Sequence, residues 1–171
     1  GSGGMGVSMQ PGWLEATLLE PELVGEYLDL AVERLLAALD AQRRAGLRLI
    51  SGGGDFAFKS GPIYAPRFFR EIMAPRWKRI FDFCRQNEMR YIFRSDGNLW
   101  SVADDLFGWA RPDAYYEVDF DAGMDFGRLR ARFPELTLIG NVSCDLLYRG
   151  PVEQIQAAAC RCVKASCNWL T

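Results

Sequence analysis

The sequence predicts an α/β protein built on about four parallel βα units, with a helix before the first of them. Three observations predict this fold class. Short apolar runs alternate with longer stretches of helical periodicity, a polar and chemically rich loop follows each run, and the loops before the runs are plainer. Strands that alternate with helices imply right-handed crossovers and a parallel sheet. Polar groups gathered after the strands are typical of parallel barrels, so we expect a partial barrel of (βα) units.

The individual elements follow from apolar spacing and from the residues that begin and end helices. Apolar residues at helical spacing predict a helix from Pro21 to about Arg44, closed by Gly46. Pro75 lacks an N–H group and therefore predicts two helical pieces between Pro66 and about residue 86. Strands are expected at 47–50, 91–93, 114–116 and 136–139, and further helices at 99–107, at 125–132 and from Pro151 onward.

Length and composition predict one ordinary globular domain. The chain has 171 residues, of which 49% are hydrophobic and 25% charged. We expect residues 1–10 to be an expression scar and flexible leader, and residues 11–171 to form a single domain.

The charge balance and the absence of long apolar segments exclude several classes of partner. The formal net charge is −2, which does not favour nucleic acid or an anionic membrane, and no apolar stretch approaches the ~20 residues needed to span a bilayer. Five cysteines in a chain of this size favour free thiols in a reducing compartment, so we expect a cytoplasmic protein. Cys160 and Cys162 should point in different directions from one helix, so we expect no metal site. We also expect no cofactor.

The chain contains no histidine, so other groups must carry any chemistry. Candidate groups follow the expected strands: Asp55, Asp96, Glu117, Asp119 and Asn141 should converge on one rim of the sheet. Converging carboxylates raise one another's pKa values and serve as general acids or bases, or hold a cation. We expect Asp55, Asp96 and Glu117 to be catalytic. The alternative is that such carboxylates cap the next helix, for which Asp96 and Asp125 are suitable.

Cations and small residues near the same rim complete the expected site. Arg94 suits bidentate recognition of a carboxylate or phosphate, and Lys59 is a second cation there. Gly52–Gly54 permits a close approach of the backbone to a ligand, or simply turns the chain. The remaining residues expected to bind substrate are Ser95, Asn98 and Asn141.

Several segments resemble the uroporphyrinogen decarboxylase superfamily in their order and spacing. They are Gly54-Asp55, the stretch from Gly61 to Phe69, Pro75, Arg94-Ser95-Asp96-Gly97-Asn98, and Gly140-Asn141-Val142-Ser143. The superfamily includes the decarboxylases of haem biosynthesis and cobamide-dependent methyltransferases. The resemblance implies a TIM barrel with ligands at its C-terminal rim, and decarboxylation or methyl transfer as the reaction class.

The chain also departs from that superfamily. Its members are about twice as long, and the N-terminal segment with the catalytic aspartate of true uroporphyrinogen decarboxylases has no counterpart here. Zinc-dependent methyltransferases carry His-x-Cys where this chain has Arg94 and Asp96. After Ala159 the resemblance fades, so the chain looks truncated.

Two hypotheses of different classes follow. The first is a decarboxylase-like domain that binds a small anionic molecule at the rim. The second is a non-catalytic half-barrel remnant or oligomeric assembly module. Because four βα units leave sheet edges and one face uncovered, we expect a homo-oligomer in either case.

Overall fold

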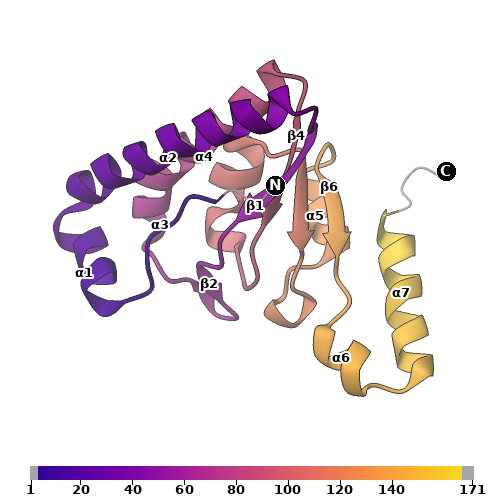
Figure 1. Cartoon of the computed structure of the whole chain (residues 1–171). Coiled ribbons are helices and arrows are strands. Elements are labelled where there is room, and N and C mark those ends of the chain that lie inside the picture. Colours follow the sequence, from indigo (N-terminus) through magenta and orange to yellow (C-terminus); the bar gives the residue numbers. More distant parts are fainter. Residues whose placement is uncertain (1–3, 167–171) are drawn as a thin grey trace.

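The computed structural model describes residues 4–166 as two N-terminal helices followed by strands that alternate with helices (Figure 1). Four strands form one parallel sheet in the order β1-β4-β5-β6. They are β1 (Leu49–Gly53), β4 (Arg90–Arg94), β5 (Ala114–Glu117) and β6 (Thr137–Gly140). The predicted α/β class with four parallel βα units is therefore confirmed, and β1 and β6 are the edge strands of this sheet.

The first strand begins and ends later than the apolar run at 47–50 predicts. β1 continues through its glycines, with Gly52 opposite Phe93 and Gly53 opposite Arg94 on β4. Gly53 has a φ of +151°, and a Cβ atom there would lie 2.0 Å from the carbonyl oxygen of Arg94. Only glycine allows the two backbones to come this close, so a sequence that resembles a turn is instead the end of a strand.

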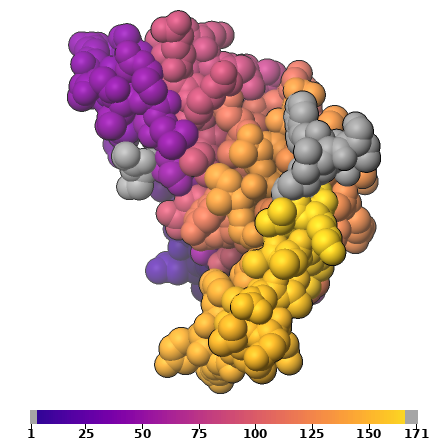
Figure 2. All heavy atoms as spheres, turned by 90° about the vertical axis from the view of Figure 1, so that its right-hand side faces the viewer, coloured from indigo at the N-terminus to yellow at the C-terminus, as the bar shows by residue number. Residues whose placement is uncertain are grey.

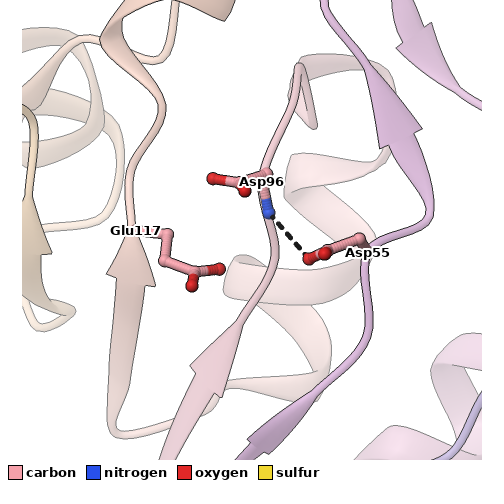
Figure 3. Close-up of side chains that lie close together, drawn as sticks. All are labelled: Asp55, Asp96 and Glu117. Atoms are coloured by element: carbon pink, nitrogen blue, oxygen red, sulfur yellow. Dashed lines mark hydrogen bonds between the residues drawn. The ribbon is translucent and has the colours of Figure 1, made fainter. Parts of the chain in front are cut away.

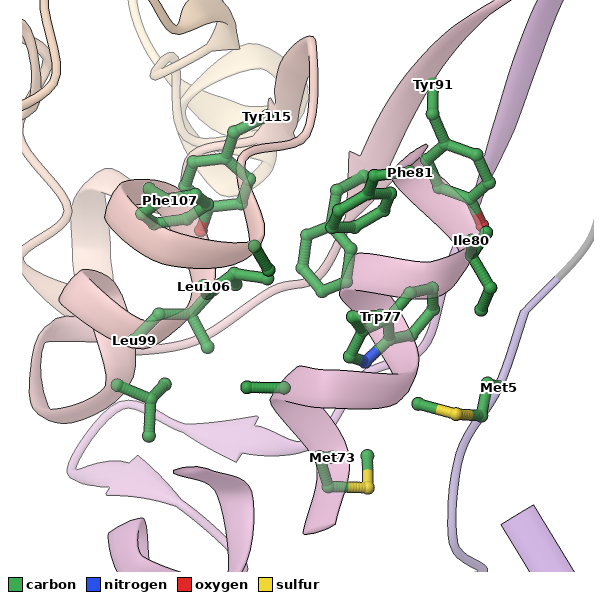
Figure 4. Close-up of a cluster of buried hydrophobic side chains, with 14 of the residues drawn as sticks. Met5, Met73, Trp77, Ile80, Phe81, Tyr91, Leu99, Leu106, Phe107 and Tyr115 are labelled. Carbon is green, nitrogen blue, oxygen red and sulfur yellow. The ribbon is translucent and has the colours of Figure 1, made fainter. Parts of the chain in front are cut away.

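One face of the sheet is covered by aromatic side chains from helices. Helix α4 (Ala74–Gln86) carries Trp77 (Figure 4), and the centroid of its ring lies 5.1 Å from that of Phe93 on β4. The π-helix η3 (Asp104–Ala110) carries Phe107, whose ring lies 4.8 Å from that of Tyr115 on β5. These large buried rings form the centre of the core and hold the helices against this face of the sheet.

Helix α2 (Pro21–Arg44) packs outside α4 and joins it through ion pairs. Arg76 Nη2 lies 2.6 Å from Asp29 Oδ2, and Arg79 Nη2 lies 2.6 Å from Glu33 Oε1. The predicted helix between Pro21 and Arg44 is confirmed.

The opposite face of the sheet is more open. Leu49 is 59% exposed and Tyr116 is 39% exposed. A hollow of about 670 Å³ runs along this face, lined among others by Leu49, Ile92, Ala114 and Ile139. Parallel sheets are normally covered on both faces, so the exposure of this second face is unusual for the fold class.

The chain stays helical across Pro75 but changes its hydrogen-bond pattern just before it. Helix α3 (Pro66–Phe68) passes through the π-helix η1 (Phe69–Met73) directly into α4. The wider π turn places the Ala74 N–H on the carbonyl of Phe69, and Arg76 Nη1 donates to the Ile72 carbonyl at 2.7 Å. Pro75 stands in the first turn of α4, where the N–H group that it lacks is least needed, and η1 joins the two expected helical pieces, α3 and α4, without a gap.

The segment at 99–107 is helical but not a regular α-helix: a 3-10 turn, η2 (Trp100–Val102), leads into η3. Another 3-10 turn, η4 (Phe120–Ala122), precedes α5 (Phe126–Arg132), which matches the helix predicted there. The helix expected from Pro151 is α7 (Val152–Ser166). Elements that the sequence pattern did not predict are α1 (Pro11–Leu19), β2 (Ala57–Phe58), β3 (Gly61–Pro62) and α6 (Cys144–Arg149).

The N-terminal segment before α1 lies against the body of the protein. The side chains of Met5 and Val7 are buried in the core. The Tyr64 hydroxyl donates to the carbonyl of Val7 at 3.1 Å. Gly4 lies so close to Gly53 that a Cβ atom on it would meet the Gly53 carbonyl oxygen at 2.2 Å.

The cysteines of the described region, Cys84, Cys144, Cys160 and Cys162, are free, as predicted. Cys160 is exposed and Cys162 buried, in keeping with their opposite directions on α7, while Cys167 lies outside the described residues. Within residues 4–166, the helices are all too short or too polar to cross a membrane.

Candidate functional site

Three carboxylates meet where β1, β4 and β5 end. Asp55 follows β1, Asp96 follows β4, and Glu117 is the last residue of β5. One carboxylate oxygen from each lies within 4.8 Å of the others. Figure 3 shows Glu117 directed towards the loop that carries Asp96, with Asp55 on the other side of that loop. The Asp96 N–H donates to Asp55 Oδ1 at 3.3 Å, which ties the first two loops together. The parallel topology thus brings three of the expected residues to one point.

Two of these carboxylates, Asp96 and Glu117, hold protons more tightly than isolated carboxyl groups do. Partial loss of water raises the pKa of Asp96, and the charges of Asp55 and Asp119 add to the effect. Loss of water likewise raises the pKa of Glu117, and the charge of Asp96 adds to it while Arg94 opposes it. Like charges this close disfavour full ionisation, so the cluster is suited to hold and release a proton.

Arg94 is the cation beside the cluster. Its Nη2 lies 3.6 Å from Glu117 Oε1, and its guanidinium carbon lies 5.9 Å from the centre of the Tyr116 ring. The Arg94 side chain is half exposed, so it can also reach a ligand. Glu117 Oε2 is buried and has no hydrogen-bond partner among the described residues. Glu117 also has a φ of +85°, which is costly for a residue with a side chain.

A small hollow opens beside Arg94. It measures about 220 Å³ and is lined by Gly4, Arg94, Asp55 and the β1 segment from Ser51 to Gly54. The glycines expose backbone groups to this space, as the run Gly52–Gly54 suggested. Three carboxylates with ligand atoms this close are also the donor type that Mg²⁺ or Ca²⁺ prefers, so the same cluster could hold a divalent cation.

Other residues expected to bind substrate are engaged within the protein. The buried Ser95 hydroxyl donates to the Asp96 carbonyl at 3.1 Å. Asn98 Oδ1 accepts from the Trp100 N–H at 3.0 Å. Asn98 rather than Asp96 therefore hydrogen-bonds the first residue of the turn that begins at Trp100, whereas Asp125 caps α5 as predicted, through the Arg128 N–H.

Asn141 is buried and ties together the loops after β5 and β6. Its Nδ2 donates to the carbonyls of Val118 at 3.0 Å and Met124 at 2.6 Å, and its Oδ1 accepts from the Phe126 N–H at 3.4 Å. Its carbonyl accepts from the Cys162 thiol at 3.3 Å. The Asn141 side chain is therefore used to hold the loop after β5 in place and is not free to bind a ligand.

Lys59 and Asp119 do not belong to the cluster of three carboxylates. Lys59 is exposed in the turn between β2 and β3 and lines a wide cleft of about 1010 Å³ with Arg149 and Arg161. Asp119 accepts from the Ala122 N–H at 3.1 Å and so caps η4.

Sequence reasoning missed two residues, Gly97 and Tyr115, that hold the backbone of the Asp96 loop in place. Gly97 has a φ of +81°, and a Cβ atom there would lie 2.4 Å from the Ala57 carbonyl oxygen, so the β2–β3 turn packs directly on the Asp96 loop. The Tyr115 hydroxyl donates to the Ser95 carbonyl at 3.2 Å beneath it. The glycine inside Ser95-Asp96-Gly97-Asn98 was the available signal for this close contact.

The family model for uroporphyrinogen decarboxylase (URO-D) matches residues 3–169 of the chain. No curated protein and no solved structure gives a match. The family has a TIM-barrel fold, and a parallel four-stranded sheet with helices on one face is consistent with part of such a barrel. The matched span covers nearly the whole sequence and includes all three rim carboxylates. The chain therefore belongs to the uroporphyrinogen decarboxylase-like superfamily.

Proposed function

We propose that the rim of this uroporphyrinogen decarboxylase-like domain binds a small anionic molecule and transfers a proton to or from it. The observation that carries the proposal is the meeting of Asp55, Asp96 and Glu117 beside Arg94. Asp96 and Glu117, with raised pKa values, next to one half-exposed guanidinium offer both a proton and an anion-binding donor. Perturbed carboxyl groups gathered at the C-terminal ends of parallel strands favour a functional site.

Arg94 is the residue that would bind the anion. Its guanidinium fork matches a carboxylate or phosphate, and its contact with Glu117, at 3.6 Å, is too long to occupy it fully. The hollow of about 220 Å³ beside it has room for only a small acid group and is lined by glycine backbone. An anion there would lie next to Asp55, which favours ligands that bring a proton with them or bind when the cluster is partly protonated.

Asp96 is the proposed proton donor, with Glu117 as its partner in sharing the proton. In a decarboxylation the bond between the carboxyl carbon and its neighbour breaks, CO₂ leaves, and the electron pair remains on the neighbouring carbon. That carbon then takes the proton from the acid, which water reprotonates. Methyl transfer is the other reaction class that the resemblance implies, but a proton-donating carboxyl serves decarboxylation more directly.

The test is a binding and turnover series with a matched pair of arginine variants. Porphyrins, corrinoids and small carboxylates are screened by thermal shift, because a ligand that binds only the folded chain raises its apparent stability. For any hit, Arg94→Ala should abolish the shift, whereas Arg90→Ala, at the other end of the same strand, should leave it unchanged. Asp96→Asn should retain binding but lose CO₂ release. Equal affinity in the two arginine variants would refute the assignment of the anion site.

The same screen should be repeated with MgCl₂, MnCl₂ and EDTA. A shift that depends on the cation, and that disappears in Glu117→Gln, would show that the carboxylates hold a metal ion instead of a shared proton. A shift with an anion alone supports the proton-transfer proposal.

The alternative function is a non-catalytic half-barrel that serves as an assembly module. One observation favours it: Ser95, Asn98 and Asn141 hydrogen-bond within the protein and so stabilise the rim without a ligand. A screen that shows no stabilisation by any ligand, with or without cations, would support this alternative.

A further inference from the structure

The two ends of the molecule carry complementary surfaces, one apolar and acidic and the other apolar and basic. Figure 1 shows α1 at one end of the molecule and α7 at the other. The acidic surface is the α1–α2 groove, formed by residues 10–30, and the basic surface is the α6 tip, formed by residues 146–152. Neither surface contains any part of the rim site.

The α1–α2 groove is an open pocket with apolar and aromatic walls. It has a volume of about 580 Å³ and is lined by Gln10, Gly12, Trp13, Ala16, Leu23, Val24, Glu26, Tyr27 and Leu30. The rings of Trp13 and Tyr27 lie 4.7 Å apart and form one wall. Leu23 and Leu30 are more than half exposed. Exposed apolar side chains gathered around a groove mark an interaction site more often than scattered ones do.

The charges around this groove are of one sign. Residues 10–33 contain six Asp or Glu residues and no Lys or Arg. Asp29 and Glu33 pair with arginines of α4, but Glu15, Glu20, Glu22 and Glu26 form no ion pair within residues 4–166. The groove therefore favours a partner that presents an apolar anchor together with a positive charge.

The α6 tip of the same chain presents such an anchor. Tyr148 is 85% exposed, which is more than any other large hydrophobic side chain of the described region. Leu147 and Val152, close to it in sequence, are also more than half exposed. Figure 2 shows α6 and the start of α7 protruding from the body at its lower edge. Tyrosine is one of the residues that most often dominate binding energy at interfaces.

The charge at this tip is opposite to that of the groove. Arg149 is the only charged residue among residues 146–152, and beyond the tip α7 carries Arg161 and Lys164 against one acidic residue, Glu153. Arg149 directly follows Tyr148, and its guanidinium lies 5.8 Å from the centre of the Tyr148 ring. Its pair with Asp145 is fully at the surface and therefore weak, so Arg149 is able to approach another carboxylate.

We propose that the α1–α2 groove binds the α6 tip of a second copy of this chain, with Tyr148 inserted between Trp13, Leu23 and Tyr27. Arg149 of that copy then faces Glu26 at the groove's edge. Because the two surfaces differ and lie at opposite ends, the contact joins unlike patches, and a pair of copies keeps one free groove and one free tip for further contacts. This inference is independent of the proposed chemistry at the rim.

The test measures self-association by sedimentation velocity and light scattering over a range of micromolar concentrations. The wild-type chain should associate. Tyr148→Ala should raise the apparent dissociation constant by roughly tenfold or more, as expected for an aromatic anchor. Trp109→Ala removes an exposed aromatic residue that belongs to neither surface, and it should associate like the wild type. Circular dichroism checks that each variant is folded.

A mixing experiment makes the contact specific. Leu23→Arg blocks the groove but leaves the α6 tip intact, whereas Tyr148→Ala does the reverse. Each variant alone should be monomeric, and an equimolar mixture should form a one-to-one complex through the remaining native pair. Likewise, Glu26→Lys and Arg149→Glu should each weaken association, and the chain carrying both changes should regain it.

Two outcomes would overturn the proposal. A wild-type chain that stays monomeric at every concentration would leave the groove to a different partner. Association that persists unchanged in Tyr148→Ala would show that copies meet elsewhere, for example through the open face of the sheet.

Discussion

Replacing Asn141 with alanine should destabilise the protein more than its size suggests, because one amide holds two rim loops. The change leaves the carbonyls of Val118 and Met124 and the N–H of Phe126 without their partner in a buried position. Each abandoned group costs about 1–3 kcal/mol, and water that enters the vacated space reduces the sum towards its lower end. Asn141 also has a φ of +70°, which costs alanine about 1 kcal/mol more than asparagine. We expect a total loss of about 3–5 kcal/mol.

The assay is urea unfolding, which gives the free energy of unfolding for each variant. Asn141→Gly separates the two causes, because glycine accepts the positive φ and lacks only the amide; it should be about 1 kcal/mol more stable than Asn141→Ala. Asn87→Ala is the matched control: Asn87 is half-buried and donates once, to the Phe83 carbonyl at 2.8 Å, so its loss should cost only about 1 kcal/mol. The reasoning is refuted if Asn141→Ala costs no more than this control.

Three further variants test the rim and the strand ends. The raised pKa of Asp96 means that the folded chain binds this proton more tightly than the unfolded chain does. The free energy of unfolding therefore falls as the pH rises from the ordinary carboxyl pKa through the raised one. In urea unfolding, Asp96→Asn should be more stable than the wild type at pH 7, and the difference should vanish below about pH 4. Gly53→Ala places a Cβ atom 2.0 Å from a backbone oxygen and should largely prevent folding by circular dichroism, whereas Gly46→Ala, with a φ of +90° and open space around it, should cost only about 1–2 kcal/mol. Glu117→Gly should raise the thermal midpoint at neutral pH, since it relieves the positive φ and removes a like charge; a lower midpoint would mean that the contact with Arg94 outweighs both.

The strands and the main helices could be predicted because their signals are local. The helix from Pro21 repeats apolar residues at helical spacing and begins with proline, and the Asp125 side chain caps the helix that follows it. The glycine run after Ile50 misled the prediction, because nothing in the sequence shows that a second backbone passes beside Gly53. Pro75 marks the change from the π-helix η1 to α4, but the sequence does not show that the chain stays helical through this change.

The position of the candidate site could be predicted, but not which of its residues face the open rim and which form hydrogen bonds within the protein. Parallel strands carry their C-terminal ends to one edge, so Asp55, Asp96 and Glu117 had to approach one another once the strands were identified. Asn141 follows a strand in the same way, yet it points inward, and its amide is used by the neighbouring loop. Which way a polar residue turns at a strand end depends on the tertiary contacts beneath it, and a sequence does not display those.

Several unfavourable features coincide at Glu117. Glu117 combines a positive φ, a buried oxygen without a hydrogen-bond partner among the described residues, and two neighbouring carboxylates. None of these helps the chain to fold, and each could be removed by a single substitution without disturbing the aromatic core under α4. Backbone strain together with a buried carboxylate oxygen that lacks a hydrogen-bond partner is typical of a functional site. The local cost of Glu117 is thus an argument for chemistry at this rim that does not depend on family membership.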